Sequence, residues 1–453
     1  MEERIMKKTF VLFAAFVACI VLSCSKIGEP AKEEVIDPVT GMKTVTITAT
    51  IDEPETRTSY ADVSGDFSWT AGDEISVLCD DGNVYTFTAT STAATSTFTG
   101  SLPEGVGLGN RAFFPADAGH DVKGYSYHIP ESKDISGHTS ADIPMVGTLS
   151  GKVYSFSHCC GATKLTISNI PSTITKVLIT VSHPSLKLSG SFSIFTSGGY
   201  YRWNPVAAGS ESEKVFSRKV AVSGNTASIF IPYASGEDWW GTNTVNVIGY
   251  DALDTPTNLI TNKAMASSIG AVERAHVKPL TPLLVSNLAF IDWSDAGVFS
   301  STVDPSSPKL GLSEMKVTAD AYYMYARVKA PVEGFVGTHL DIYLSDGDGT
   351  GGHYAISDGS QYWTTQGTTV YREEHQGVVT TTSLSMTFNG KTIETSTTND
   401  GTNIYYYMAF PRSAYSLISS AGTVYVSFMM WNGWSCYGAI PTRYTAMLPV
   451  TLP

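Results

Sequence analysis

The chain has 453 residues, 42% of them hydrophobic and 16% charged, which is enough apolar material for two or three packed domains. Its formal net charge of −13 comes without any cluster of Lys or Arg, so nucleic acid is not an expected partner. The 40 Gly, the many Ser and Thr and the lack of long helix-forming stretches favour an all-β fold.

The first residues have the layout of a secretory signal. Lys7 and Lys8 precede an apolar run over residues 10–22, and the run ends at a small residue, Ser23. A basic start, a short apolar core and a small residue before the break are typical of exported proteins. The run is shorter than the roughly 20 residues that a membrane-spanning helix needs. The sequence therefore predicts a signal peptide over residues 1–23.

Cys24 follows this signal directly. Val21-Leu22-Ser23-Cys24 resembles the lipobox of bacterial lipoproteins, in which the cysteine becomes the lipidated first residue. Each buried CH₂ of an acyl chain contributes about 0.8 kcal/mol, so two or three chains give a firm membrane anchor. An ordinary signal with an incidental cysteine is the alternative, and the position of Cys24 favours lipidation. Residues 24–42, rich in Pro, Gly and charge, are then expected to form a flexible tether.

The remaining cysteines do not form a metal or redox motif. Cys79, Cys159, Cys160 and Cys436 are scattered and contain no CxxC pair. Because neighbours in a strand point to opposite faces, we expect at most one of Cys159 and Cys160 to lie in a core.

Folded sequence begins at residue 43. Val45, Ile47, Ala49 and Ile51 alternate with threonines, a two-residue period that predicts a half-buried strand. Similar strands, separated by turn-forming clusters, are predicted at residues 75–78, 85–88, 177–181, 228–232 and 245–248.

Short strands with regular turns favour tandem β-sandwiches. We expect three such domains, at residues 43–150, 151–283 and 284–453. A turn-rich patch marks the first boundary, and Pro279 and Pro282 mark the second. Residues 412–420 are the best candidate for a short helix.

Short motifs follow one another in a fixed order through the first part of the chain. They are Thr56-Arg57-Thr58, Trp69-Thr70-Ala71-Gly72-Asp73-Glu74-Ile75, Phe98-Thr99-Gly100, Phe113-Phe114-Pro115 and Phe156-Ser157-His158. In this order the sequence resembles the fimbrillin-like lipoproteins of Gram-negative gut and oral anaerobes, over about residues 43–283. The resemblance implies an adhesive or structural protein of the outer-membrane surface, with pilus subunits as partners. Trp69 itself, just before a Gly-Asp turn, is expected to have a structural role as a cap on a sandwich core.

The resemblance also implies a role for Arg57. Pilus subunits of this type mature by cleavage after an arginine in the loop behind the first strand, and loss of that strand opens a groove for a neighbouring subunit. Arg57 lies in such a polar loop after residues 45–51. An ordinary surface arginine is the alternative, and it is favoured. The extension of about 170 residues beyond the resemblance suits a tip, anchor or independent adhesin better than a repeating shaft subunit.

The C-terminal part is rich in aromatic residues and loosely resembles carbohydrate-binding β-sandwiches at residues 291–294, 317–328 and 340–352. Surface glycans are therefore a second candidate partner, since exposed aromatic rings stack on sugar rings and amides bond to hydroxyls. Core packing is the favoured alternative for the tryptophans, with Trp434 as the best exception. The candidate glycan-binding residues are Trp363, Trp431, Asn432 and Trp434.

Calcium is the one cofactor that the sequence suggests. Asp346 and Asp348 sit in a glycine-rich stretch close to Asp341, and clustered carboxylates can supply some of the six to eight oxygens that Ca²⁺ takes. No Glu follows at the distance that an EF-hand needs, and a plain turn is the favoured alternative.

Catalytic motifs are missing from the sequence: it has no GxSxG elbow, no HExxH helix and no GxxxxGK[ST] loop. The cluster Glu373-Glu374-His375 is explained by a charged loop. We therefore expect a non-catalytic protein that acts in adhesion or as a fimbria-associated tip, anchor or accessory subunit. The alternative is a surface glycan-binding lipoprotein for nutrient capture. An undetected hydrolase is a third reading, because paired carboxylates across a cleft leave no sequence motif.

Overall fold

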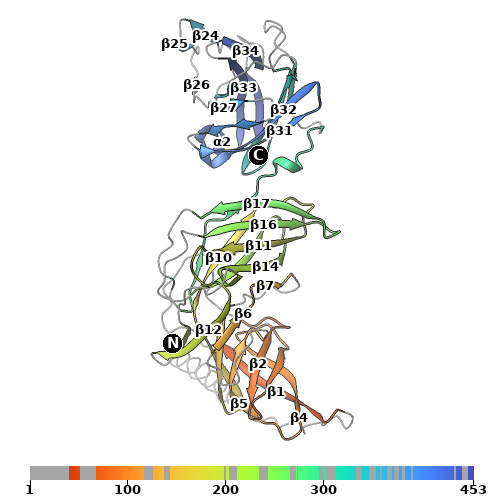
Figure 1. Ribbon diagram of the computed structural model, residues 1–453, viewed down its shortest axis with the longest axis vertical. Coiled ribbons are helices and arrows are strands. Elements are labelled where there is room, and N and C mark those ends of the chain that lie inside the picture. The colour runs from red at the N-terminus through yellow and green to blue at the C-terminus, as the bar shows by residue number, and fades with distance from the viewer. Residues whose placement is uncertain are drawn as a thin grey trace, which may run out of the picture.

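The structure is a computed structural model that describes most of the chain from residue 40 onward. The described residues are 40–51, 68–116, 126–136, 143–197, 200–203, 212–233, 243–265, 272, 274–294, 299–302, 312–332, 339–345, 353–357, 360–364, 370–371, 377–379, 383–388, 391–432, 435–440 and 447–453. They confirm the all-β prediction, and Figure 1 shows three bodies that follow one another along the long axis. No helix in these residues has the length and apolar character to cross a membrane.

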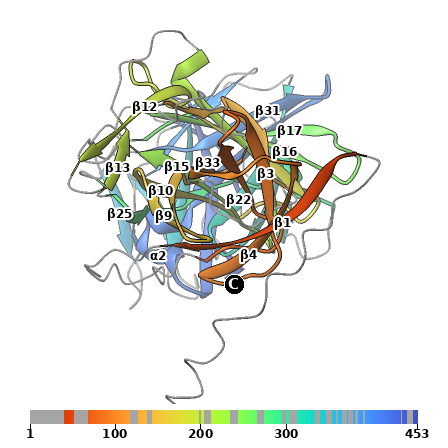
Figure 2. The same cartoon turned by 90° about the horizontal axis from the view of Figure 1, so that it is seen from below.

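The first body is a closed barrel. Its strands are β1 (Met42–Ile51), β2 (Glu74–Cys79), β3 (Val84–Ala89), β4 (Thr95–Pro103), β5 (Leu108–Phe114), β8 (Met145–Ser150) and β9 (Val153–His158). They follow one another around the barrel in the order β1-β4-β3-β2-β5-β8-β9. β1 pairs with β4 antiparallel over nine residues and with β9 parallel over four, and this double pairing closes the sheet. Figure 2 shows β1 and β4 side by side at the near end of the molecule.

Trp69 has the structural role that the sequence predicted, but it fills the centre of the barrel rather than capping its core. Its side chain is 1% exposed, and its ring meets those of Phe98, Phe114 and Phe156 edge to face at 5.0–5.4 Å between centroids. Its Nε1 donates a hydrogen bond to the Ala49 carbonyl at 3.1 Å, which satisfies the one polar atom of the side chain. Trp69 therefore ties β1 to the barrel centre.

The second body has three sheets. Its elements are β6 (Ser126–Ile129), β7 (Ser132–Asp134), β10 (Gly161–Ser168), β11 (Lys176–Ser182), β12 (Gly190–Ser197), β13 (Tyr200–Trp203), η1 (Ser212–Lys214), β14 (Val215–Ala221), β15 (Ala227–Tyr233), β16 (Thr244–Tyr250), β17 (Pro256–Ala264), β18 (Val277–Pro279) and β19 (Leu283–Leu284). The sheets run β15-β10-β18, β17-β16-β11-β14-β7 and β13-β12-β6, and β19 also pairs with β10.

The first two bodies are interleaved along the chain. The connection from β5 to β8 of the barrel carries β6 and β7, which pair with β12 and β14 of the second body. Arg218 on β14 is 2% exposed and donates from its Nη1 to the Pro130 carbonyl at 3.1 Å. The boundary expected at residue 150 falls in the turn between β8 and β9. Both of these strands belong to the barrel, so the first body continues to the end of β9.

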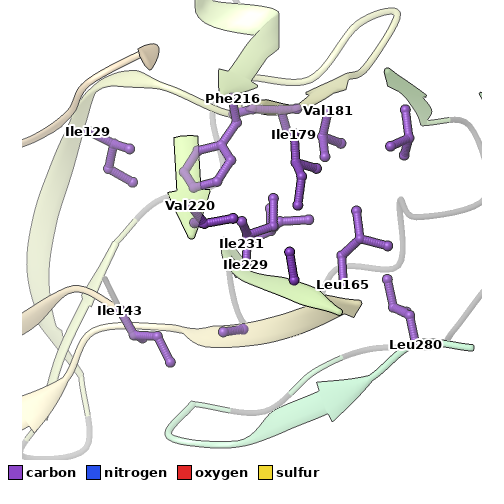
Figure 3. Packing of buried hydrophobic residues seen from close by; sticks show 14 of the residues in the cluster. Ile129, Ile143, Leu165, Ile179, Val181, Phe216, Val220, Ile229, Ile231 and Leu280 are labelled. Carbon is purple, nitrogen blue, oxygen red and sulfur yellow. The ribbon is translucent and has the colours of Figure 1, made fainter. Parts of the chain in front are cut away.

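The core of the second body lies between its sheets. Figure 3 shows Ile179 and Phe216, from β11 and β14, facing Leu165 and Ile231, from β10 and β15, and all four side chains are fully buried. Burial of a side chain of this size contributes about 1.5–3 kcal/mol.

The same core contains both adjacent cysteines, which corrects one expectation. Cys159 and Cys160 are 1% and 0% exposed. They lie in the bend between β9 and β10 rather than within a strand, so the alternation of faces does not apply to them. Phe113 and Val146, on the outside of the barrel, pack into this core as well. The bend therefore sits where the first two bodies meet, and both thiols are covered.

The third body is built mainly of two facing sheets with short hairpins at their ends. Its elements are η3 (Leu288–Phe290), β20 (Phe299–Thr302), β21 (Glu314–Ala319), β22 (Tyr323–Pro331), β23 (His339–Ser345), β24 (His353–Ser357), β25 (Ser360–Thr364), β26 (Val370–Tyr371), β27 (Gly377–Val379), β28 (Leu384–Ser385), β29 (Thr387–Phe388), β30 (Lys391–Thr392), β31 (Glu394–Asn399), β32 (Asn403–Pro411), η5 (Arg412–Ala414), α2 (Ser416–Ser419), β33 (Gly422–Asn432), β34 (Ser435–Ile440) and β35 (Leu448–Leu452).

The two main sheets of this body run β20-β21-β22-β32-β31 and β28-β27-β23-β33-β34, and β26 and β35 join the second through β23 and β33. Phe410 and Phe428 meet between the sheets with their ring centroids 6.4 Å apart. The short helix predicted at residues 412–420 is confirmed by η5 and α2. Arg412 is 3% exposed and holds this turn, since its Nε donates to the Ile418 carbonyl at 2.7 Å.

Candidate functional sites

The first candidate site is the strand that closes the barrel. Ile47, Ala49 and Ile51 of β1 are buried in the barrel core, on the alternating positions that the sequence predicted. Only threonines stand between them, so β1 presents its apolar side chains to the barrel and its hydroxyls to the other face. The strand is thus an N-terminal element that the rest of the barrel surrounds on both edges.

The described residues on either side of the stretch 52–67 are held at almost the same place in the barrel. The amide of Ile51 donates to the Ala94 carbonyl at 3.1 Å, and the amide of Trp69 donates to the neighbouring Ala93 carbonyl at 2.9 Å. Residues 52–67, which include Arg57, lie outside the described residues, as does Cys24. The residues that flank this stretch are therefore both hydrogen-bonded to the same segment, Ala93 and Ala94.

The structure places three of the four predicted glycan-binding residues on strands. Trp431 and Asn432 end β33, where Trp431 is opposite His339 of β23 and Asn432 is opposite Ser435 of β34. Trp363 lies on the hairpin β24–β25, which pairs with no strand of the two large sheets in the described chain. Trp434 lies outside the described residues. Strand pairing thus does not bring Trp363 together with Trp431, and a glycan site at these residues stays a prediction.

Of the three predicted calcium ligands, Asp341 is the one that lies within the described residues. Asp341 on β23 is 5% exposed, and the Tyr343 hydroxyl donates to its Oδ2 at 3.1 Å. Asp346 and Asp348 lie outside the described residues, as do Glu373, Glu374 and His375. Within the part of the chain that is described, no group of three or more His, Cys, Asp or Glu side chains could hold a metal ion. Calcium binding remains a prediction.

An aromatic face that the sequence analysis did not single out lies on the outside of the sheet β20-β21-β22-β32-β31. On β22, Met324, Ala326 and Val328 are fully buried, while Tyr323, Arg327 and Lys329 are half-buried. β32 continues the same alternation, with half-buried tyrosines between buried residues. The register places Arg327 opposite Tyr407 and Lys329 opposite Tyr405. Two-residue alternation in both strands was the signal that could have found this face. We call the set Trp293, Glu314, Arg327, Tyr405 and Tyr407 the aromatic face.

Arg327 organises the aromatic face. Its Cζ lies 5.7 Å from the Trp293 ring centroid and 5.4 Å from that of Tyr405, so the guanidinium stands between two rings. Its Nη2 lies 2.5 Å from Glu314 Oε1. The Trp293 ring continues the row to Tyr407, with 5.9 Å between centroids. A planar cation, its carboxylate partner and three rings are therefore held as one assembly.

Asp400 fixes the outer end of this assembly. Its Oδ1 accepts from the amides of Asn403 and Thr402 at 2.7 and 2.9 Å, and its Oδ2 accepts from the Tyr405 hydroxyl at 3.0 Å. These hydrogen bonds, those from the two amides above all, lower the pKa of Asp400 to about 2. The carboxylate is therefore ionised at neutral pH and keeps the Tyr405 ring in place.

The inner end of the same sheet contacts the end of the second body, where the Tyr323 hydroxyl lies 3.5 Å from the Leu284 carbonyl. Leu288 of η3 packs on Tyr325 and Ala409. The Tyr325 hydroxyl donates to Asp320 Oδ2 at 2.6 Å, and burial together with this carboxylate raises the pKa of Tyr325. Burial also raises the pKa of Tyr323 to about 12. The inner end is thus a packed junction, and the aromatic face begins at its edge, where Trp293 and Tyr407 pack against it, and continues to Tyr405.

The fold and these sites define an all-β protein of tandem bodies. No protein-family model matches the sequence. No curated protein matches it either.

Three of the solved structures that are similar to part of the chain illustrate the likeness. A protein with a proposed role in cell adhesion from Bacteroides ovatus ATCC 8483 shares 16% identity at a TM-score of 0.28, over 53% of this chain and 92% of its own. A second such protein, from Bacteroides thetaiotaomicron VPI-5482, shares 12% at 0.23, over 53% and 92%. The tip fimbrial protein Mfa3 from Porphyromonas gingivalis, with a C-terminal truncation, shares 14% at 0.20, over 53% and 96%. Identities and TM-scores at this level assign neither a family nor a function.

Proposed function

We propose that the chain is a non-catalytic lipoprotein of the outer-membrane surface, which acts in adhesion or as a fimbria-associated tip, anchor or accessory subunit. The observation that carries the proposal is the place of β1, an N-terminal strand that closes the barrel through pairs with both β4 and β9. Removal of this strand would leave two unpaired edges and would uncover the core positions of Ile47, Ala49 and Ile51. A strand from another subunit can pair with both edges and cover these core positions at the same time.

The proposed cleavage site follows both the proposed lipid anchor and strand β1 in the sequence. Cys24 and β1 both precede Arg57, so a cut after Arg57 would separate the lipid-bearing segment from the rest of the chain. The ends at Ile51 and Trp69 are each held by the Ala93–Ala94 turn, so such a cut need not disturb the barrel directly. An uncut chain fits an anchored adhesin or anchor subunit, whereas a cut chain fits a subunit that accepts a strand.

Mass spectrometry of the protein extracted from the cell surface tests this proposal. We expect acyl groups on Cys24 in the uncut form, or an N-terminus at Thr58 in the processed form, together with recovery of the protein in sheared fimbriae. The variant Arg57→Ala should abolish processing, and the neighbouring variant Thr58→Ala, which keeps the arginine, is its control. A mature chain without acyl groups that turns over a substrate would overturn the proposal.

A glycan-binding lipoprotein for nutrient capture is the second candidate function. It is favoured by the half-buried rings of the third body, since aromatic side chains that stay partly open to water suit sugar binding. Loss of sugar binding in Trp434→Ala would support this candidate at the residues that the sequence suggested. Unchanged binding in that variant would count against them.

A further inference from the structure

The aromatic face is open to solvent only in part, and its rings differ from core rings in this respect. Tyr405, Tyr407 and Trp293 are all half-buried, whereas Tyr406, between the two tyrosines on β32, is 0% exposed. Trp293 and Tyr407 pack on their inner side against the buried cluster of Leu288, Tyr325 and Ala409, and Tyr405 lies outside that cluster. The rings are therefore held by their neighbours while each keeps part of its surface exposed.

Hydroxyl groups border the rings along the neighbouring strand. Ser396 and Thr398 of β31 are exposed, and the register places them opposite Tyr407 and Tyr405. Thr398 Oγ1 lies 3.3 Å from the Tyr407 hydroxyl. In the described sheet β31 is an edge strand, and these positions carry no apolar side chain. The face therefore offers ring surfaces beside groups that both donate and accept hydrogen bonds.

The charges around the rings are largely balanced by near neighbours. Glu314 pairs with Arg327, and Lys316 Nζ donates to the Trp293 carbonyl at 2.7 Å. Lys329 stands 5.8 Å from the Tyr405 ring centroid, and Asp400 accepts from the hydroxyl of that ring. No field of one sign results, which disfavours a polyanion such as nucleic acid. Exposed polar side chains around the rings also disfavour a protein partner, whose interface core would be apolar.

We infer that the aromatic face binds the rings of a neutral oligosaccharide chain, with Tyr405, Tyr407 and Trp293 as stacking platforms and Thr398 and Ser396 as hydrogen-bonding groups. Sugar rings present apolar C–H faces with hydroxyls around their edges, and the aromatic face presents the complementary arrangement. The inference names a ligand class for the adhesion proposed above and rests on that proposal.

Titration calorimetry of the full chain with cellohexaose, xylohexaose, mannohexaose and chitohexaose tests the inference. We expect at least one of these neutral hexasaccharides to bind with a Kd below about 1 mM. Tyr405→Ala should weaken that binding about tenfold or more, whereas Tyr405→Phe, which keeps the ring, should stay within about threefold of wild type. Tyr85→Ala is the matched control, because the Tyr85 hydroxyl donates to Asp81 in a turn of the barrel just as that of Tyr405 donates to Asp400. It should leave binding unchanged.

A second pair of variants guards against loss of folding. Thr398 and Thr392 are both exposed, but only Thr398 borders the rings, so Thr398→Glu should weaken binding while Thr392→Glu should not. Three results would overturn the inference: no binding of any of the four hexasaccharides, tighter binding of a heparin-derived hexasaccharide, or equal losses in the paired variants. Recovery of the protein in sheared fimbriae would then still stand as support for the proposed function, so the two can fail separately.

Discussion

Asn169 Nδ2 lies 2.9 Å from Asp320 Oδ2, although the two residues are 151 positions apart and belong to different bodies. Asn169 has a φ of 62°, in the left-handed region that asparagine tolerates, and its side chain also donates to the Val285 carbonyl at 3.0 Å. The amides of Tyr322 and Tyr323 each donate to Asp320 Oδ1 at 2.8 Å. A single carboxylate thus joins the second body to the third.

Asn169→Asp should weaken this junction. The substitution replaces a donor with a second carboxylate facing Asp320, and we expect the free energy of unfolding to fall by about 2 kcal/mol in urea titrations. The double variant Asn169→Asp, Asp320→Asn restores one donor and one acceptor and should recover part of that loss. A double variant no more stable than Asn169→Asp would show that the contact does not hold the bodies together.

Trp69→Leu should destabilise the barrel by about 3–5 kcal/mol, because it leaves a cavity among three aromatic rings and removes the hydrogen bond to Ala49. Thermal unfolding followed by circular dichroism measures this loss. Trp293→Leu is the comparison, since Trp293 is half-buried, and it should cost clearly less stability. Similar losses in the two variants would contradict the central position of Trp69.

His158 should make stability depend on pH. Burial lowers the pKa of His158 from 6.5 to about 3, so the unfolded chain takes up the proton before the folded one does. Stability therefore falls as the pH drops below 6.5, by about 1.4 kcal/mol per pH unit once the unfolded histidine is fully protonated. His158→Gln should remove this part of the slope in urea titrations between pH 6.5 and about 5, above the range where carboxylates titrate. An unchanged slope would mean that the folded protein accepts the proton.

The three buried cysteines should resist alkylation. Burial raises the pKa of Cys79 to about 11 and raises that of Cys159 well above its ordinary value, so both thiols are neutral at pH 8. We expect peptides with Cys79, Cys159 and Cys160 to stay unlabelled after iodoacetamide treatment of the folded chain at that pH. The same treatment in urea should label all three. Rapid labelling of Cys159 in the folded chain would indicate that the bend between the first two bodies opens.

The barrel and the second body should unfold together. Phe113 and Phe114 are neighbours, but Phe113 packs into the core of the second body and Phe114 into that of the barrel. Either change to Ala should cost about 3–5 kcal/mol and should lower the same calorimetric transition. Two transitions, each moved by one variant alone, would show that the bodies fold independently.

Local periodicity predicted much of this fold. The expected strands at residues 45–51, 75–78, 85–88, 177–181, 228–232 and 245–248 match β1, β2, β3, β11, β15 and β16, and the short helix was also correct. These features depend on neighbouring residues, whose alternation the sequence displays directly. The prediction of a structural role for Trp69 succeeded for the same reason, since the turn beside it is local.

Pairing between distant segments could not be predicted in this way. The parallel contact of β1 with β9 joins Ile51 to Phe156, and nothing in either strand encodes the partner. The same holds for β6 and β7, which leave the barrel to join the second body. The aromatic face was not predicted, because Trp293 is distant in sequence from Arg327 and Tyr407 and contacts them only in the folded chain. The tryptophans visible in the sequence therefore pointed to a glycan site at Trp363 and Trp431 instead.

The crossing of β6 and β7 has a consequence for how such chains can diversify. A genetic exchange that joined a new partner sequence at residue 150 would deprive the second body of two of its strands and of the Pro130 carbonyl that Arg218 binds. A break near residue 285, by contrast, severs the hydrogen bonds of Asn169 and Leu284 with the third body, which are side-chain hydrogen bonds between the two bodies in the described chain. The strand exchange thus ties the first two bodies together as one unit of inheritance, whereas the third body can be replaced without breaking a sheet of the other two in the described chain.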